Sequence, residues 1–148
     1  MEGEFQQVTI GKFIFRVKAG YLYRDDGLWL APLAAAGTLR IGLSDYRQQS
    51  SGDVAFVVLP AVGQTVHGGD DVVNVETVKV DLAVPAPFDV EVTAVNEALV
   101  DAPELINQDP YGAGWLVELR PAAWPVVGLL DADAYLAVMT AQAEEAAK

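Results

Sequence analysis

Cysteine is absent from this 148-residue sequence, and histidine occurs only once, as His67. Without thiols the chain has no disulfide, no thiolate metal site and no cysteine nucleophile. One imidazole gives no histidine cluster for zinc, and we expect no metal site. A Ser-His-Asp triad would depend on His67, which stands in a glycine-containing loop with no visible nucleophile beside it. These absences argue against most classes of enzyme.

Basic residues are scarce, because nine Lys and Arg stand against 21 Asp and Glu and leave a net charge of −12. Such a charge repels the phosphates of nucleic acids and the anionic surface of membranes, so we expect neither as a partner. No apolar run approaches the roughly 20 residues that a membrane span needs. The first residues also lack the pattern of a secretion signal. We therefore expect a cytoplasmic globular protein.

Short stretches of alternating apolar residues recur along the chain. They predict a mainly β fold with peripheral helices, either a sandwich or a flattened barrel. Asp131 is a good N-cap for a C-terminal helix with Leu136 and Met139 on one face. Residues 1–37 are predicted to add an edge strand and a cover to the same fold, and residues 38–148 to form its main body. The predicted core includes the following side chains: Phe13, Phe15, Val17, Trp29, Trp115 and Trp124.

Residues 71–85 show a break in their two-residue apolar period between Val75 and Val78. A strand cannot change phase without a turn or a bulge, so the break predicts a tight hairpin with residues 76–79 at its tip. Lys79 and Asp81 then lie on the face opposite the buried valines. Lys79 is the only basic residue between Arg47 and Arg120. It is either a solubilising lysine at a hairpin end or an attachment point for a swinging cofactor.

Several motifs in fixed order resemble the lipoyl carriers of the glycine cleavage system H protein family. They cover about residues 38–140 and comprise Ile41–Tyr46, Gly52–Val54, Leu59–Gly63, Glu76–Lys79, Val95–Leu99, Pro103–Asn107 and Asp109–Leu116. The resemblance implies a hybrid barrel-sandwich fold and a non-enzymatic carrier. It also implies lipoic acid joined by an amide to Lys79, attached by a lipoate-protein ligase, with dihydrolipoyl dehydrogenase as a partner. The residues around the attachment site would be Glu76, Thr77, Val78, Val80 and Asp81.

Two segments depart from the family pattern. After Lys79 the chain continues with Val80–Pro87 rather than with small residues, Ser-Asp and an aromatic, and Gly27-Leu28-Trp29 replaces the usual His-Glu-Trp. The sequence has the lysine of the family but different residues around it. In this it resembles the lipoate-binding proteins of bacterial sulfur oxidation, which work with heterodisulfide-reductase-like complexes. We therefore expect a carrier in sulfur oxidation as the leading interpretation. The alternatives are a glycine cleavage carrier of the aminomethyl group, working with the glycine cleavage enzymes, and an interaction module without lipoate.

Overall fold

The computed structural model describes residues 4–35 and 37–148, and within them the predicted mainly β fold with peripheral helices is confirmed. The strands are β1 (Phe5–Ile10), β2 (Phe13–Lys18), β3 (Leu22–Tyr23), β4 (Leu28–Pro32), β5 (Leu39–Leu43), β6 (Val54–Val58), β7 (Thr65–Val66), β8 (Asp71–Thr77), β9 (Asp81–Pro85), β10 (Val90–Val95) and β11 (Val117–Pro121). The helices are α1 (Asp45–Ser51), α2 (Ala98–Asp101), α3 (Leu105–Gln108) and α4 (Ala132–Ala146). Of the helices in these ranges, none is long and apolar enough to cross a membrane.

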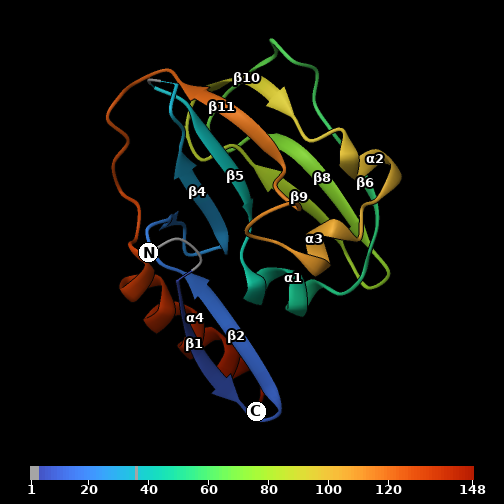
Figure 1. Ribbon diagram of the computed structural model, residues 1–148, viewed down its shortest axis with the longest axis vertical. Helices are drawn as coiled ribbons and strands as arrows, with labels where there is room; N and C mark the ends of the chain where they lie inside the picture. Colours follow the sequence, from blue (N-terminus) through green and yellow to red (C-terminus); the bar gives the residue numbers. More distant parts are fainter. Residues whose placement is uncertain (1–3, 36) are drawn as a thin grey trace.

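Two antiparallel sheets enclose the main body of the molecule (Figure 1). One has the strand order β3-β4-β5-β11-β10-β7, and the other has the order β6-β8-β9. Their inner faces meet in a core of branched aliphatic side chains, which we call the aliphatic core. Its fully buried members include Leu30, Leu39, Ile41, Val75, Val92, Leu99, Ile106, Leu116, Val117 and Leu119. Most of these side chains come from strands, whereas Leu99 comes from α2 and Ile106 from α3.

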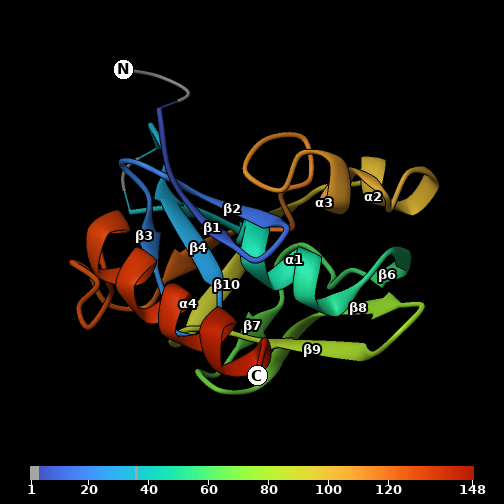
Figure 2. The same ribbon diagram turned by 90° about the horizontal axis from the view of Figure 1, so that it is seen from below.

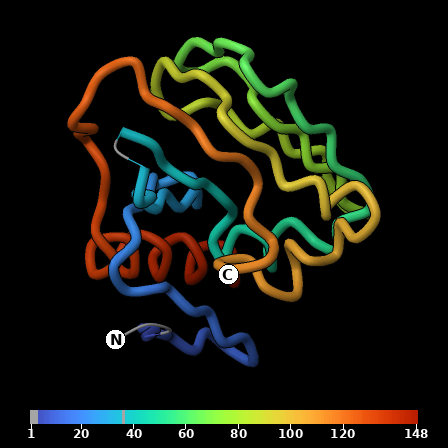
Figure 3. Tube along the Cα trace, turned by 45° about the horizontal axis from the view of Figure 1, so that its top comes forward, coloured from blue at the N-terminus to red at the C-terminus, as the bar shows by residue number. Residues whose placement is uncertain are grey.

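A second cluster, the aromatic core, lies where the β1–β2 hairpin and α4 meet the larger sheet. It consists of Phe15, Val17, Tyr23, Trp29, Tyr111, Ala132, Tyr135, Met139 and Ala143. α4 packs along β1 and β2 (Figure 2) and is reached from β11 by a long connection down one side of the molecule (Figure 3). Asp131 caps α4 as predicted, because its Oδ1 accepts a hydrogen bond from Ala134 N at 2.8 Å.

The N-terminal segment contributes more strands than the sequence patterns indicate. β1 and β2 form a hairpin of their own, while β4 lies inside the large sheet between β3 and β5. Residues 1–3 and 36 of the predicted 1–37 segment lie outside the described residues. Phe15 and Val17 are buried, but the prediction for Phe13 is wrong, because half of its surface is exposed. It lies in the first position of β2 and contacts the aromatic core only from outside, through the ring of Phe15.

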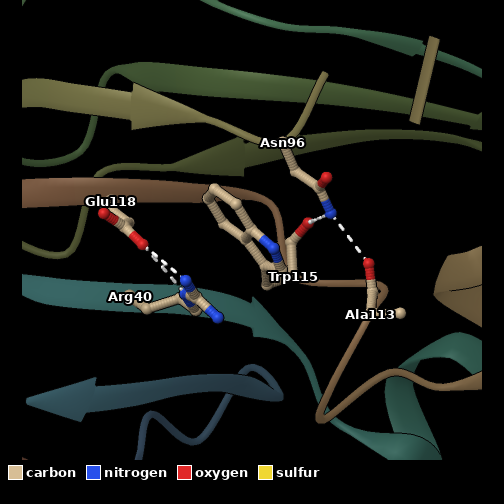
Figure 4. Close-up of polar contacts among 5 residues, drawn as sticks. All are labelled: Arg40, Asn96, Ala113, Trp115 and Glu118. Atoms are coloured by element: carbon tan, nitrogen blue, oxygen red, sulfur yellow. Dashed lines mark hydrogen bonds and ion pairs between the residues drawn. The ribbon is translucent and has the colours of Figure 1, made fainter. Parts of the chain in front are cut away.

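The three tryptophans have different environments. Trp29 is fully buried as predicted, but Trp124 is half exposed, because it lies in the irregular connection between β11 and α4. Trp115 is partly buried and lies under the guanidinium of Arg40, 4.2 Å from the ring centre to the carbon of that group. Arg40 also forms an ion pair of 2.7 Å with Glu118 (Figure 4). Trp115 is therefore part of a polar clamp between β5 and β11.

Asn96 lies beside that clamp and holds the chain that leads into β11. Its side-chain nitrogen donates to the carbonyl oxygens of Ala113, at 2.8 Å, and Trp115, at 2.7 Å (Figure 4). These two hydrogen bonds direct the side-chain amide of Asn96 toward the approach to β11 rather than toward α2. α2 begins at Ala98 without a side-chain cap. The Val95–Leu99 motif therefore has an architectural role here.

Candidate functional site

The hairpin of β8 and β9 carries Lys79 at its apex. The last paired residues are Glu76 and Asp81, and Thr77 N donates to Val80 O at 2.8 Å to close the turn. The turn therefore comprises residues 77–80, so the predicted tip at 76–79 is displaced by one residue. The change of apolar phase falls within this turn. Buried valines and a leucine flank it at Val73, Val75, Leu82 and Val84.

Val78 and Val80 do not continue the buried set, because they belong to the turn rather than to the strands. Val78 is 77% exposed and Val80 is 41% exposed. The lysine is therefore flanked by two aliphatic side chains at the surface.

The hydroxyl of Thr77 organises the turn. Its oxygen accepts hydrogen bonds from the backbone N–H groups of Lys79, at 3.2 Å, and Val80, at 2.8 Å. The same hydroxyl donates to the carbonyl oxygen of Ser51, at 2.6 Å, at the end of α1. Val78 N adds a further bond to Asp53 O at 2.9 Å. The tip of the hairpin is thus tied to the C-terminal end of α1.

Lys79 is exposed, and its ammonium donates to the carbonyl oxygen of Ser50 at 2.9 Å. This bond turns the side chain toward α1. Glu76 and Asp81 are also exposed, and Asp81 accepts a hydrogen bond of 2.7 Å from the side chain of Asn74. The structure therefore brings the six predicted site residues together at one hairpin end. That these residues hold or surround a cofactor stays a prediction.

A cavity of about 250 Å³ lies beside Lys79, which forms part of its lining. β2 contributes Phe13 and Phe15, α1 contributes Gln49 and Ser50, and alanines line it at the end of α4. None of the described lining residues is acidic. Local sequence patterns do not predict this cavity, because parts of its wall come from the two ends of the chain.

The two segments that depart from the family pattern meet on the other side of α1. Leu28 of β4 and Leu43 of β5 are buried against Leu82 and Val84 of β9. The space left between these elements is only about 20 Å³, enough for about one water molecule. Two charged residues, Asp26 and Arg47, also line this space. The aliphatic side chains therefore leave only a small space at this face.

His67 lies before the first residue of β8, at the opposite end of that strand from Lys79. Its side chain is 79% exposed, and its Nδ1 is 3.8 Å from a carboxylate oxygen of Asp89. No group of three His, Asp or Glu residues that could hold a metal ion occurs in the described ranges. The geometry around His67 thus shows an exposed loop residue rather than an active site.

Comparison with known proteins gives consistent results. The model of the glycine cleavage H-protein family matches residues 21–142. The glycine cleavage system H protein of Mycolicibacterium smegmatis is 49% identical over 128 residues, which cover 84% of this chain and 97% of that protein. The corresponding protein of Pseudoalteromonas atlantica is 47% identical over 114 residues, which cover 76% of this chain and 88% of that protein.

A solved structure extends the similarity to the fold. The crystal structure of a glycine cleavage system H protein from Mycobacterium marinum has a TM-score of 0.72 and 38% identity, and the match covers 82% of this chain and 97% of that one. The predicted H-protein fold with a C-terminal helix is confirmed. The matched range contains Lys79 but leaves out β1, β2 and the end of α4. The chain belongs to the glycine cleavage H-protein family, whose members are lipoyl carriers without catalytic activity of their own.

Proposed function

We propose that Lys79 carries lipoate in amide linkage and that the resulting arm carries the aminomethyl group in glycine cleavage. The observation that carries this proposal is the position of Lys79 at the apex of a tied hairpin, in the Glu76–Lys79 motif of the family. The relatives named above are glycine cleavage system H proteins, which favours this pathway.

The chain contributes the position of the arm, while the dithiolane of the lipoyl group supplies the chemistry. A lipoate-protein ligase forms the amide from the lysine nitrogen and a lipoyl group activated with ATP, and AMP leaves. The amide is uncharged, so attachment makes the acidic surface still more negative. Glu76 and Asp81 flank the lysine as exposed carboxylates. They are suited to steer the basic docking faces of the ligase, the decarboxylase, the aminomethyltransferase and dihydrolipoyl dehydrogenase.

The attachment site is tested by ligase treatment and intact-mass measurement. We expect the unmodified chain to gain one lipoyl group, and Lys79→Arg to gain none, because arginine keeps the charge but cannot form the amide under these conditions. Lys12→Arg is the matched control, since Lys12 lies in the turn between β1 and β2. A lipoyl mass on Lys79→Arg would overturn the assignment.

The pathway is tested by exchange of carbon dioxide with the carboxyl group of glycine, catalysed by the decarboxylase in the presence of the lipoylated chain. A known H protein serves as the reference. We expect a rate within about ten-fold of the reference, equivalent to a loss of less than about 1.4 kcal/mol in productive interaction. A rate near background with a fully lipoylated chain would contradict the glycine cleavage proposal.

A second candidate function is sulfur transfer with a heterodisulfide-reductase-like complex, in which the arm carries sulfur instead of the aminomethyl group. The closed face between β4 and β9 favours it, because Leu28 and Leu82 fill the space where the two family departures meet. The leucine side chains give no hydrogen bond to a charged aminomethyl group, and Asp26 is the one acidic residue among the described residues that line this space. Loss of glycine exchange, together with binding of the lipoylated chain to such a complex, would favour this candidate.

A further inference from the structure

The cavity beside Lys79 has a wall that the family match does not contain. Phe13 and Phe15 belong to the β1–β2 hairpin, which ends at Lys18, whereas the match begins at residue 21. The alanines at the end of α4 also lie beyond its last residue, 142. Two additions to the matched range, one at each end of the chain, therefore converge beside the lysine.

The wall is suited to an uncharged group. The rings of Phe13 and Phe15 stack with their centres 6.1 Å apart, and Phe13 is 50% exposed although it is among the largest apolar side chains. The ammonium of Lys12 already lies over the Phe13 ring, 5.7 Å from its centre, and no described lining residue is acidic. A second cation entering this space would therefore lose hydration without gaining a partner carboxylate. An uncharged, apolar ring would instead remove exposed aromatic surface from water.

The hydrogen bond of Lys79 points the side chain along this wall. The lysine Nζ donates to the carbonyl oxygen of Ser50 at 2.9 Å, and Ser50 itself lines the cavity. An ammonium group has three N–H donors, and an amide nitrogen formed from it keeps one. The bond to Ser50 can therefore survive acylation. The acyl chain then starts at the edge of the cavity rather than in open solvent.

We propose that this cavity is a resting site for the oxidised lipoyl arm, with the dithiolane ring seated against Phe13. The inference rests on the proposed attachment of lipoate to Lys79. It adds that the N-terminal hairpin shields the disulfide of the ring until a partner draws the arm away. The site selects by charge, because an arm that carries an ammonium group does not gain from this wall.

The test compares three lipoylated proteins: the unmodified sequence, Phe13→Ser and Ile14→Ser. Phe13 and Ile14 are neighbours in β2 and are both 50% exposed, but only Phe13 lines this cavity. The measured quantity is the rate at which a small water-soluble phosphine reduces the dithiolane. We expect Phe13→Ser to react roughly three- to ten-fold faster than the unmodified sequence, since the reactive fraction rises when docking is lost. Ile14→Ser should react at the rate of the unmodified sequence.

Each outcome bears on one proposal. Equal rates for all three proteins, or the same acceleration in both variants, would overturn the resting site. Intact mass before reduction confirms that each protein carries the lipoyl group, so failure of the attachment proposal is recognised separately. Thermal melting of the three proteins excludes loss of the hairpin as the cause. As a second measurement, proton contacts between the dithiolane and the Phe13 ring should appear in nuclear magnetic resonance spectra.

Discussion

The aliphatic core and the aromatic core hold different parts of this molecule in different ways. The aliphatic core consists of side chains without polar atoms, so its contacts have no preferred direction. In the aromatic core the buried rings also place hydroxyl groups. Tyr23 donates to Lys18 O and Tyr111 donates to Arg16 O, each at 2.7 Å, and Tyr135 shares a hydrogen bond of 2.8 Å with Ser44. Such bonds need defined geometry, so this core fixes positions as well as burying surface.

The difference matters for the site, because Ser44 is also the N-cap of α1. Tyr135 therefore connects α4 to the helix whose other end holds the hairpin tip and Lys79. The aliphatic core builds the hairpin, and the aromatic core places the elements around it. Variants in each core separate these two contributions.

Truncation should give the largest effect. A chain that starts at Thr38 lacks β4, which lies inside the large sheet and supplies the fully buried Trp29 and Leu30. We expect this chain not to fold. A chain that starts at Ala19 lacks only β1 and β2 and should stay folded with a lower melting temperature, because the aliphatic core is complete. Circular dichroism during heating measures both. Unchanged melting of the shorter chain would show that residues 1–37 are a detachable arm.

Gly42→Ala should produce the next largest effect, because this position joins the two cores. A Cβ at Gly42 would lie 2.5 Å from the indole of Trp29, which is paired with Gly42 across β4 and β5. Overpacking of this kind costs about 1–3 kcal/mol of the free energy of unfolding. Denaturant unfolding measures the loss. Trp29→Phe in the same chain should recover part of it, and an equal loss in the double variant would contradict the proposed clash.

Tyr135→Phe should have a smaller effect that depends on pH. Loss of the hydrogen bond to Ser44 is expected to cost about 1 kcal/mol at pH 8. Burial raises the pKa of Tyr135 to about 12 from its ordinary value of 10.0. Between these values the unfolded chain releases this proton before the folded chain does. The stability contributed by the raised pKa is therefore present below pH 10 and is lost as the pH rises toward 12.

The variant lacks this titration, so its stability should fall less than that of the unmodified chain between pH 8 and pH 11. The gap between the two proteins should narrow as the pH rises. Urea unfolding at both pH values measures it. A constant gap would show that Tyr135 does not titrate differently in the folded state.

His67→Ala is expected to have the smallest effect, since the side chain is exposed and lies outside both cores. Its stability should change by less than about 0.5 kcal/mol, and carrier activity in the reconstituted pathway should stay within a few-fold. Complete loss of activity, with the fold and lipoylation intact, would favour an enzyme that uses His67 with a carboxylate such as Asp70.

The sequence predicts best those features that depend on neighbouring residues. The start of α4 follows from the cap at Asp131, and the β8–β9 hairpin follows from the phase change after Val75. β4 escaped prediction because Leu28, Trp29 and Leu30 are all buried, so no alternation marks it. The predicted position of the hairpin tip is off by one residue because the exposed valines of the turn resemble strand residues in the sequence.

Features that depend on distant segments could not be predicted from local patterns. Phe13 and Lys79 are far apart in the sequence, and only the packing of both chain ends around α1 brings them to one cavity. The departures at Leu28 and Leu82 were recognised separately, but their contact across one closed face was not. The expectation of a sulfur-oxidation pathway rested on those departures alone, whereas the named relatives support glycine cleavage more directly.

The single hydroxyl of Thr77 has a consequence for the proposed attachment of lipoate by a ligase. Two backbone N–H groups of the turn and the end of α1 converge on this hydroxyl, so the loop around Lys79 has its shape before any partner arrives. A ligase that binds this loop loses little conformational entropy in ordering it. A free peptide of residues 71–85 has the same side chains but lacks Ser51. Recognition by the ligase should thus depend on the folded protein, that is, on the backbone shape of the turn around Lys79 as well as on its sequence.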